Sequence, residues 1–166
     1  MVPALRQFIE KHIDVIEQRK WTKLYELAHE EVPFQVGNLS YNLIKAGINP
    51  LEELDYVLPY MFSDANDLKD IELPANIKQV QQKSFVKCYQ LKKIVIPKSV
   101  MFIDETAFDA CYELEDIQYL GTAEEFLQAV EKPATAFWDC ATGTVQCADK
   151  DVHVGFNTDT TGKDFL

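Results

Sequence analysis

The sequence predicts a mixed α/β chain, in which a helical N-terminal segment precedes a short solenoid of stacked repeats with a parallel β-sheet. Residues recur at an offset of 23 in the middle of the chain, and the first third shows helical periodicity. The 166 residues, 47% of them apolar, suit one compact domain with a small cap. We therefore expect a helical cap over residues 1–66, a solenoid with a C-terminal capping unit over residues 67–156, and a frayed tail over residues 157–166.

The N-terminal segment has apolar side chains at helical spacing. A third short helix is expected to end at Gly47, since glycine readily adopts the left-handed conformation that closes a helix. A fourth is expected to begin with Asn49 as its cap and Pro50 as its first residue. We interpret residues 51–62 as a helical element docked where a preceding repeat would lie. The first two helical faces are Leu5, Phe8, Ile9, His12, Ile13 and Ile16, and then Trp21, Leu24, Tyr25 and Ala28.

The repeat unit has 23 residues, and each copy contains a short alternating strand that a proline ends by withholding a donor. One unit cannot enclose its own apolar side chains, but stacked copies form a continuous core. The outward strand positions then form two rows, Asp70, Lys93 and Asp116 in one and Glu72, Val95 and Gln118 in the other. The aligned sets are Leu68, Leu91 and Leu114; Ile71, Ile94 and Ile117; Leu73, Ile96 and Tyr119; Pro74 and Pro97; Ile77 and Val100; Val80, Ile103 and Phe126; Phe85 and Phe108; and Cys88 and Cys111.

The C-terminal part closes the stack. Thr122 and Glu125 have the spacing of a capping box, which predicts a short helix that buries Phe126. A hairpin around Asp149 and Lys150 is expected to follow.

These repeats resemble the BspA-type leucine-rich repeats, whose unit reads roughly Ile-x-Ile-Pro, then Ala-Phe, then Cys-x-x-Leu. The copies here are IELPANIKQVQQKSFVKCYQL at residues 71–91 and IVIPKSVMFIDETAFDACYEL at residues 94–114. The resemblance covers residues 68–152 and implies protein–protein recognition rather than catalysis. Its terminal unit is similar at Tyr119, Gly121, Thr122, Trp138, Cys147 and Asp149. The AGINPLEELDYV run at residues 46–57 also resembles the N-terminal part of small repeat proteins encoded by bacteriophages.

Composition excludes several classes of protein. The net charge of −11 repels phosphate backbones and anionic membranes, so direct nucleic-acid or membrane binding is not expected. We expect no secretory signal and no membrane span, because charged residues interrupt the apolar residues near the N-terminus. Four cysteines are too few for a disulfide framework, and we expect a cytoplasmic protein.

The cysteines have two interpretations. Cys88 and Cys111 lie one repeat apart, a spacing that a disulfide tolerates, but we expect them to be stacked core residues. Cys140, Cys147 and His153 could ligate zinc with Asp149, yet they lack a Cys-x-x-Cys pair, and we assign them to structure. No metal and no cofactor is therefore predicted.

Nothing in the sequence predicts an enzyme. His12 is expected to be a core or cap residue, and neither His29 nor His153 lies beside a nucleophile motif. Adjacent carboxylates such as Glu52 and Glu53 point apart on a helix or strand, so they form no acid–base pair. A hydrolase with a cysteine nucleophile is the remaining enzymatic alternative.

The prediction is therefore a non-enzymatic module that binds another protein, with the bacteriophage resemblance suggesting a phage-encoded modulator of a host protein. Its contact residues would be Asp70, Glu72, Lys93, Val95, Asp116 and Gln118. Residues 99–166 hold three lysines and fourteen acids, so this acidic half would steer a basic partner. The alternative is an acidic decoy that mimics nucleic acid and inhibits a host nucleic-acid enzyme.

Overall fold

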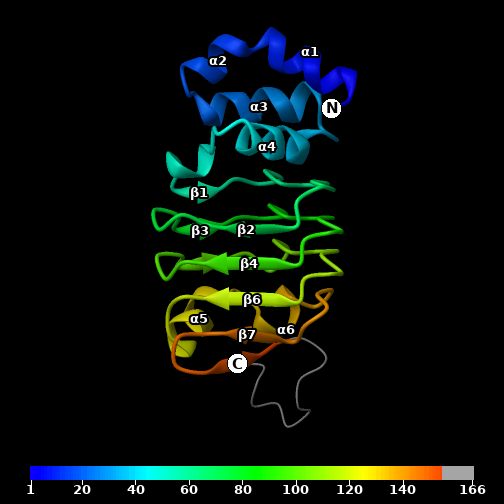
Figure 1. Ribbon diagram of the computed structural model, residues 1–166. Coiled ribbons are helices and arrows are strands. Elements are labelled where there is room, and N and C mark those ends of the chain that lie inside the picture. Colours follow the sequence, from blue (N-terminus) through cyan, green and yellow to red (C-terminus); the bar gives the residue numbers. More distant parts are fainter. Residues whose placement is uncertain (155–166) are drawn as a thin grey trace.

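The computed structural model describes residues 1–154, and the expected frayed tail at residues 157–166 lies outside them. The N-terminal helices occupy one end of an elongated molecule, strands are stacked in layers below them, and two further helices lie near the other end (Figure 1). The prediction of a mixed α/β chain with parallel sheets is confirmed. Within the described residues, no helix has both the length and the apolar character needed to cross a bilayer.

Four helices form the N-terminal part. The first expected helix is interrupted at His12, whose φ of −113° separates two shorter helices. Gly47 has the predicted left-handed conformation, with a φ of 85°, just after the fourth helix. The bounds are α1 (Pro3–Lys11), α2 (Ile13–Glu17), α3 (Trp21–Glu31) and α4 (Val36–Lys45).

The interpretation of residues 51–62 as a helical element is wrong. Asn49 does cap a turn, since its side chain accepts a hydrogen bond of 3.0 Å from the N–H of Leu51, but only a 3-10 turn, η1 (Pro50–Glu52), forms. Strand β1 (Tyr56–Val57) follows and pairs with β3 (Gln79–Val80) in parallel. The segment therefore does lie at the position of a preceding repeat, but as a strand.

The repeats build two sheets, in which the paired strands from β1 to β6 are shifted by 23 residues. The three-stranded sheet has the order β1-β3-β5, and the five-stranded sheet has the order β2-β4-β6-β7-β8. Asp70 pairs with Lys93, and Lys93 pairs with Asp116, so the predicted register is confirmed. The remaining bounds are β2 (Asp70–Glu72), β4 (Lys93–Ile96), β5 (Phe102–Ile103), β6 (Asp116–Tyr119), β7 (Thr144–Gln146) and β8 (Asp151–His153).

A column of phenylalanine rings runs through the core between repeats. Phe85 stacks on Phe62 with centroids 5.0 Å apart and on Phe108 with centroids 5.3 Å apart. Phe137 continues the column at 5.1 Å from Phe108. All four rings are buried, and full burial of such a ring stabilises the fold by about 1.5–3 kcal/mol. The column of stacked rings thus extends from the first repeat to the C-terminal unit.

Each repeat also contains a residue with a left-handed backbone that is not glycine. Asp64, Lys87 and Ala110 recur at the repeat spacing with φ values of 57°, 61° and 61°. In each case the N–H of this residue reaches the next layer. The donor–acceptor pairs are Asp64 N to Val86 O at 3.0 Å, Lys87 N to Asp109 O at 2.9 Å, and Ala110 N to the Asp139 side chain at 2.9 Å.

The C-terminal unit has the predicted capping box and hairpin. Thr122 and Glu125 exchange both hydrogen bonds at the start of α5 (Ala123–Ala129). Helix α6 (Pro133–Ala136) follows, and β7 and β8 pair in antiparallel fashion. The Asp149 carboxylate accepts a hydrogen bond of 2.8 Å from the N–H of Ala123, which fixes the hairpin to the first turn of α5.

The helical part is docked closely onto the first repeat. The N–H of Gly37, in α4, donates to the carbonyl of Ser63 at 3.1 Å. A β-carbon at position 37 would lie only 2.1 Å from that same oxygen. Only glycine therefore permits this approach of α4 to the repeat.

Candidate functional site

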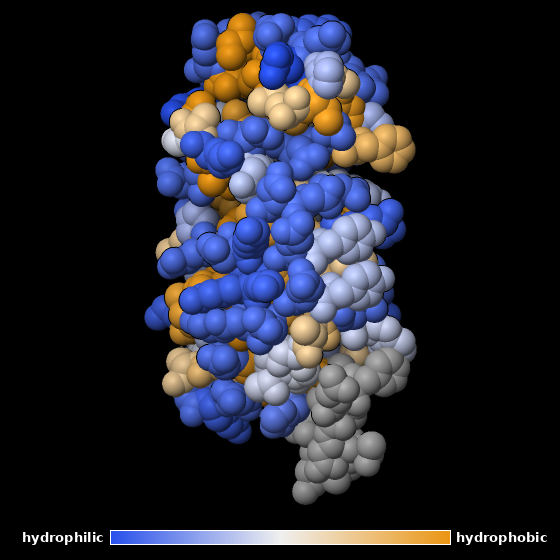
Figure 2. Space-filling model, turned by 45° about the vertical axis from the view of Figure 1, so that its right-hand side comes forward, coloured by the Kyte–Doolittle hydropathy of each residue, from blue (hydrophilic) through white to orange (hydrophobic). Residues whose placement is uncertain are grey.

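The six predicted contact residues lie on one face of three neighbouring strands. Strands β2, β4 and β6 each place alternate side chains outward, while Ile94 and Ile117 point into the core. The outward rows are Asp70, Lys93 and Asp116, and Glu72, Val95 and Gln118. Figure 2 shows hydrophilic side chains in rows across this part of the molecule.

The two ends of this face differ in exposure and in side-chain contacts. Asp70, Glu72 and Lys93 are exposed, whereas Val95 and the β6 residues are half-buried. The amide of Gln118 donates to Asp116 at 3.1 Å, so these two side chains hold each other. The β2 end of the face is therefore the freer one.

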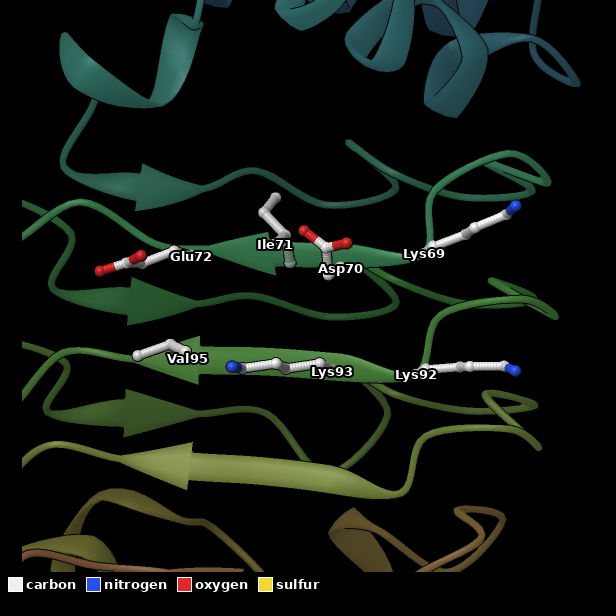
Figure 3. Close-up of a pocket in the computed structure, with 7 residues that line it drawn as sticks. All are labelled: Lys69, Asp70, Ile71, Glu72, Lys92, Lys93 and Val95. Atoms are coloured by element: carbon white, nitrogen blue, oxygen red, sulfur yellow. The ribbon is translucent and has the colours of Figure 1, made fainter.

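Lys93 makes no direct contact with the two acids that flank it in its row. It lies between Asp70 and Asp116 in the register, yet it forms no ion pair with any residue of the described part of the chain. Its side chain runs along β4 toward Val95 (Figure 3). The ammonium group thus stays in water.

An open cavity of about 400 Å³ lies over β2 and β4. Lys69 and Lys92, which sequence reasoning missed, extend side by side at its edge (Figure 3). They occupy equivalent repeat positions, so the 23-residue offset would have identified them. The full lining is Lys69, Asp70, Ile71, Glu72, Lys92, Lys93 and Val95. The cavity thus includes four of the six predicted residues and excludes Asp116 and Gln118.

A second surface feature was also missed. Tyr89 and Tyr112 are 43% and 57% exposed, and their rings stack with centroids 6.0 Å apart. They lie one repeat apart, in the turns that lead into β4 and β6. The same offset that aligns the neighbouring cysteines aligns these tyrosines.

The cysteines are placed as core residues. Cys88 and Cys111 are buried free thiols that donate to the carbonyls of Phe62 and Phe85, at 3.0 Å and 3.1 Å. Contact with the Cys111 thiol and burial raise the pKa of Cys88 well above its usual value. Burial also raises the pKa of Cys147, to about 11. A thiolate nucleophile needs the opposite shift.

The histidines and the candidate zinc ligands have other contacts. The ring of His12 packs on Phe8 with centroids 4.7 Å apart and bonds to Glu31 at 3.0 Å, which fits the expected cap or core role. His153 contacts the hydroxyl of Thr144 at 3.1 Å. Over residues 1–154, no group of three or more His, Cys, Asp or Glu residues is arranged to hold a metal ion.

Several carboxylates of the C-terminal half accept hydrogen bonds from backbone N–H groups. Glu125 and Asp149 accept from N–H groups at the start of α5, and these bonds lower the pKa of both carboxyls. Asp139 accepts from Ala110. Asp109 lies near Asp139, and its pKa is raised by burial and by that neighbouring charge. Part of the acidity therefore has a structural explanation.

Comparison with known proteins relates these repeats to one family. The family described as "BspA type Leucine rich repeat region" matches residues 9–145 in six copies. A solved leucine rich cell surface protein from Faecalibacterium prausnitzii A2-165 is 33% identical, with a TM-score of 0.45. That match covers 46% of this chain and 20% of the other, so the chain spans a small part of that protein. Among curated proteins, none matches.

Proposed function

The chain belongs to the BspA-type leucine-rich repeat family, and from that premise we propose that it is a non-enzymatic module that binds another protein. The binding surface is the outward face of the five-stranded sheet. In this proposal, residues 67–156 act as a short solenoid and residues 1–66 cover its end. Leucine-rich repeats of this family suggest protein interaction, and the placement of the outward residues agrees with that role.

The observation that carries the proposal is a set of charged side chains with no structural role. Asp70, Glu72 and Lys93 are exposed, and their side chains make no hydrogen bond or ion pair within residues 1–154. They surround the half-buried Val95 and line the same cavity. Charges of both signs around an apolar centre are typical of protein-binding surfaces.

A nucleic-acid-mimicking decoy is the alternative, because fourteen acids lie in residues 99–166. Asp139 and Asp149 bind backbone N–H groups, Glu125 belongs to a capping box, and Glu105 pairs with Lys132 at 3.0 Å. Fewer acids are then available to imitate phosphates. This contact pattern favours the sheet face over the decoy.

The proposal also includes a reducing cytoplasm and the absence of catalysis. Free thiols at Cys88 and Cys111 are compatible with a reducing compartment, and raised thiol pKa values disfavour a cysteine hydrolase. Direct nucleic-acid binding is not part of the proposal, given the charge of −11. A phage source and a host protein as the partner remain predictions.

The test compares the wild-type protein with a single substitution on the proposed face. The wild type, this variant and a control variant are immobilised and exposed to the same native lysate, and bound proteins are identified by mass spectrometry. Val95→Arg places a large charge at the centre of the face and is expected to lose the specific partner. Lys98→Asp, on an exposed residue outside the six, is the matched control and should retain it. Equal capture by all three proteins would contradict the proposal.

A further inference from the structure

The N-terminal edge of the five-stranded sheet is open. Strand β2 is the first strand in the sheet order and, within residues 1–154, pairs with β4 alone. In parallel sheets, alternate residues bond to opposite neighbours. The N–H of Leu73 donates to Val95 at 3.0 Å and the N–H of Lys93 donates to Lys69 at 3.3 Å, so Lys69, Ile71 and Leu73 face β4.

The residues between them therefore direct their backbone groups away from the sheet. By this alternation the N–H and C=O groups of Asp70 and Glu72 point away from β4, and within residues 1–154 they make none of the backbone hydrogen bonds found outside the strand pairings; both residues are exposed. These groups are spaced as an added strand would require.

The Ile71 side chain, which an added strand would cover, is more exposed than its register partners. Ile94 and Ile117 are 0% and 1% exposed, while their register partner Ile71 is only half-buried. Figure 3 shows the Ile71 side chain rising from β2 on the side away from β4, beside that of Asp70. The column of isoleucines thus begins with a side chain that is only half-buried.

The charges at the edge of β2 indicate which residues an added strand would carry. Both outward residues of β2, Asp70 and Glu72, are acidic. Within the stack, the residue paired with Asp70 is the basic Lys93, and opposite charges across paired strands are favourable. A second copy of this chain fits poorly, because its other sheet edge, β8, presents Asp151. Acids at an edge therefore deter self-stacking and admit a basic strand.

We propose that the open edge of β2 binds an extended basic–apolar–basic segment of a partner protein as an additional strand. The segment bonds to the backbone of Asp70 and Glu72, places its apolar residue over Ile71, and sets its two basic residues opposite the two acids. This inference rests on the proposed protein-binding function and specifies the chemistry of the partner. The proposed function uses outward side chains of the sheet, whereas this inference adds hydrogen bonds to the backbone N–H and C=O groups of β2.

The test uses a synthetic blocked peptide, Lys-Val-Lys-Val-Lys, and isotopically labelled protein. Binding is expected to slow hydrogen exchange of the Asp70 and Glu72 amides by at least about tenfold at saturation. Two control peptides carry backbone N-methyl groups, one on its valines and the other on its lysines. Alternate residues of a strand direct their N–H groups to opposite edges, so each control has one edge blocked. The control whose blocked edge faces β2 must lose binding. A peptide with glutamate in place of lysine should bind at least about tenfold more weakly.

Two variants test the backbone and the charges of the β2 edge separately. Glu72→Pro removes an N–H that β4 does not use, so it should abolish peptide binding with little effect on melting. The double variant Asp70→Lys with Glu72→Lys should reverse the preference toward the glutamate peptide, and the two N-methylated peptides keep strand addition testable if the proline variant fails to fold.

Unchanged amide exchange, or equal binding by both N-methylated peptides, would overturn the inference. The sheet-face proposal is tested separately by Val95→Arg, which leaves the backbone of β2 unaltered. Loss of capture by Val95→Arg without any protection of Asp70 and Glu72 would reject strand addition alone.

Discussion

The carboxylate of Asp139 accepts a hydrogen bond of 2.9 Å from the backbone N–H of Ala110. In the two preceding repeats, the equivalent N–H groups of Asp64 and Lys87 donate to carbonyls of the next layer. The side chain of Asp139 thus replaces a carbonyl where the regular repeat ends. The left-handed conformation of Ala110 points its N–H toward the C-terminal unit, and the Asp139 carboxylate accepts this hydrogen bond.

We expect Asp139→Ala to lower the free energy of unfolding by about 1–2 kcal/mol, because the N–H of Ala110 loses its acceptor. Urea denaturation measures this change. Asp139→Asn keeps an acceptor oxygen and is the matched control, with a clearly smaller loss. Equal losses in both variants would show that the hydrogen bond is not responsible.

Replacement of Ala110 by glycine should act in the opposite direction. At a φ of 61°, alanine is strained and glycine is not, so Ala110→Gly is expected to stabilise the fold by about 0.5–1 kcal/mol. The same substitution at Ala107, a buried residue without a positive φ, should destabilise. Thermal melting of the two variants would decide, and a lower melting temperature for Ala110→Gly would contradict the strain.

The docking of the helices is tested at Gly37. Gly37→Ala puts a methyl group 2.1 Å from the carbonyl oxygen of Ser63, so α4 must move away from the first repeat. We expect a loss of at least about 2 kcal/mol in urea denaturation. Gly47→Ala has open space but a φ of 85°, and should cost only about 1 kcal/mol. A loss at Gly37 no greater than at Gly47 would contradict the close approach.

The pH dependence of stability should show the raised pKa of Asp109, which is caused by burial and by the charge of Asp139. A carboxyl with a raised folded-state pKa contributes stability below its unfolded pKa and loses that contribution as the pH rises through the folded value. Asp109→Asn is therefore expected to be more stable than wild type near neutral pH. Its advantage should shrink as the pH falls through the raised pKa. A constant difference across pH would refute the shift.

Glu125 provides the opposite case, since its capping hydrogen bonds lower its pKa. Its contribution is present above the unfolded pKa and is lost as the pH falls through the folded value. Glu125→Gln should accordingly be less stable than wild type at neutral pH and indistinguishable from it in acid.

Much of the repeat architecture follows from the sequence because stacking demands identical spacing. The alignment of Ile71, Ile94 and Ile117 gives the register directly, and the capping box at Thr122 and Glu125 is a local signal. Phe137 escaped notice because it follows Phe108 by 29 residues, so a search at 23 cannot align it. Helices α5 and α6 lie in that longer interval.

The candidate site was predicted less completely. Periodicity identifies which side chains point outward, but it does not tell which of them find partners in three dimensions. Thus Lys93 forms no ion pair within residues 1–154 although the register places it between two acids, whereas Gln118 donates a hydrogen bond to Asp116. The helical pattern around Asn49 and Pro50 predicts a helical element over residues 51–62. The long-range pairing of Tyr56–Val57 with β3 overrides that pattern and makes this part a strand.

The most direct test of the sheet-face account is the dissociation constant of the captured partner, measured at low and physiological salt. The variants are Val95→Arg and the double charge reversal Glu113→Lys with Glu131→Lys, whose exposed acids lie outside the face. The account predicts that Val95→Arg weakens binding by at least about tenfold at both salt concentrations. The double reversal should slow association mainly at low salt. Loss of binding by the double reversal at physiological salt, with Val95→Arg silent, would contradict the account and favour the decoy.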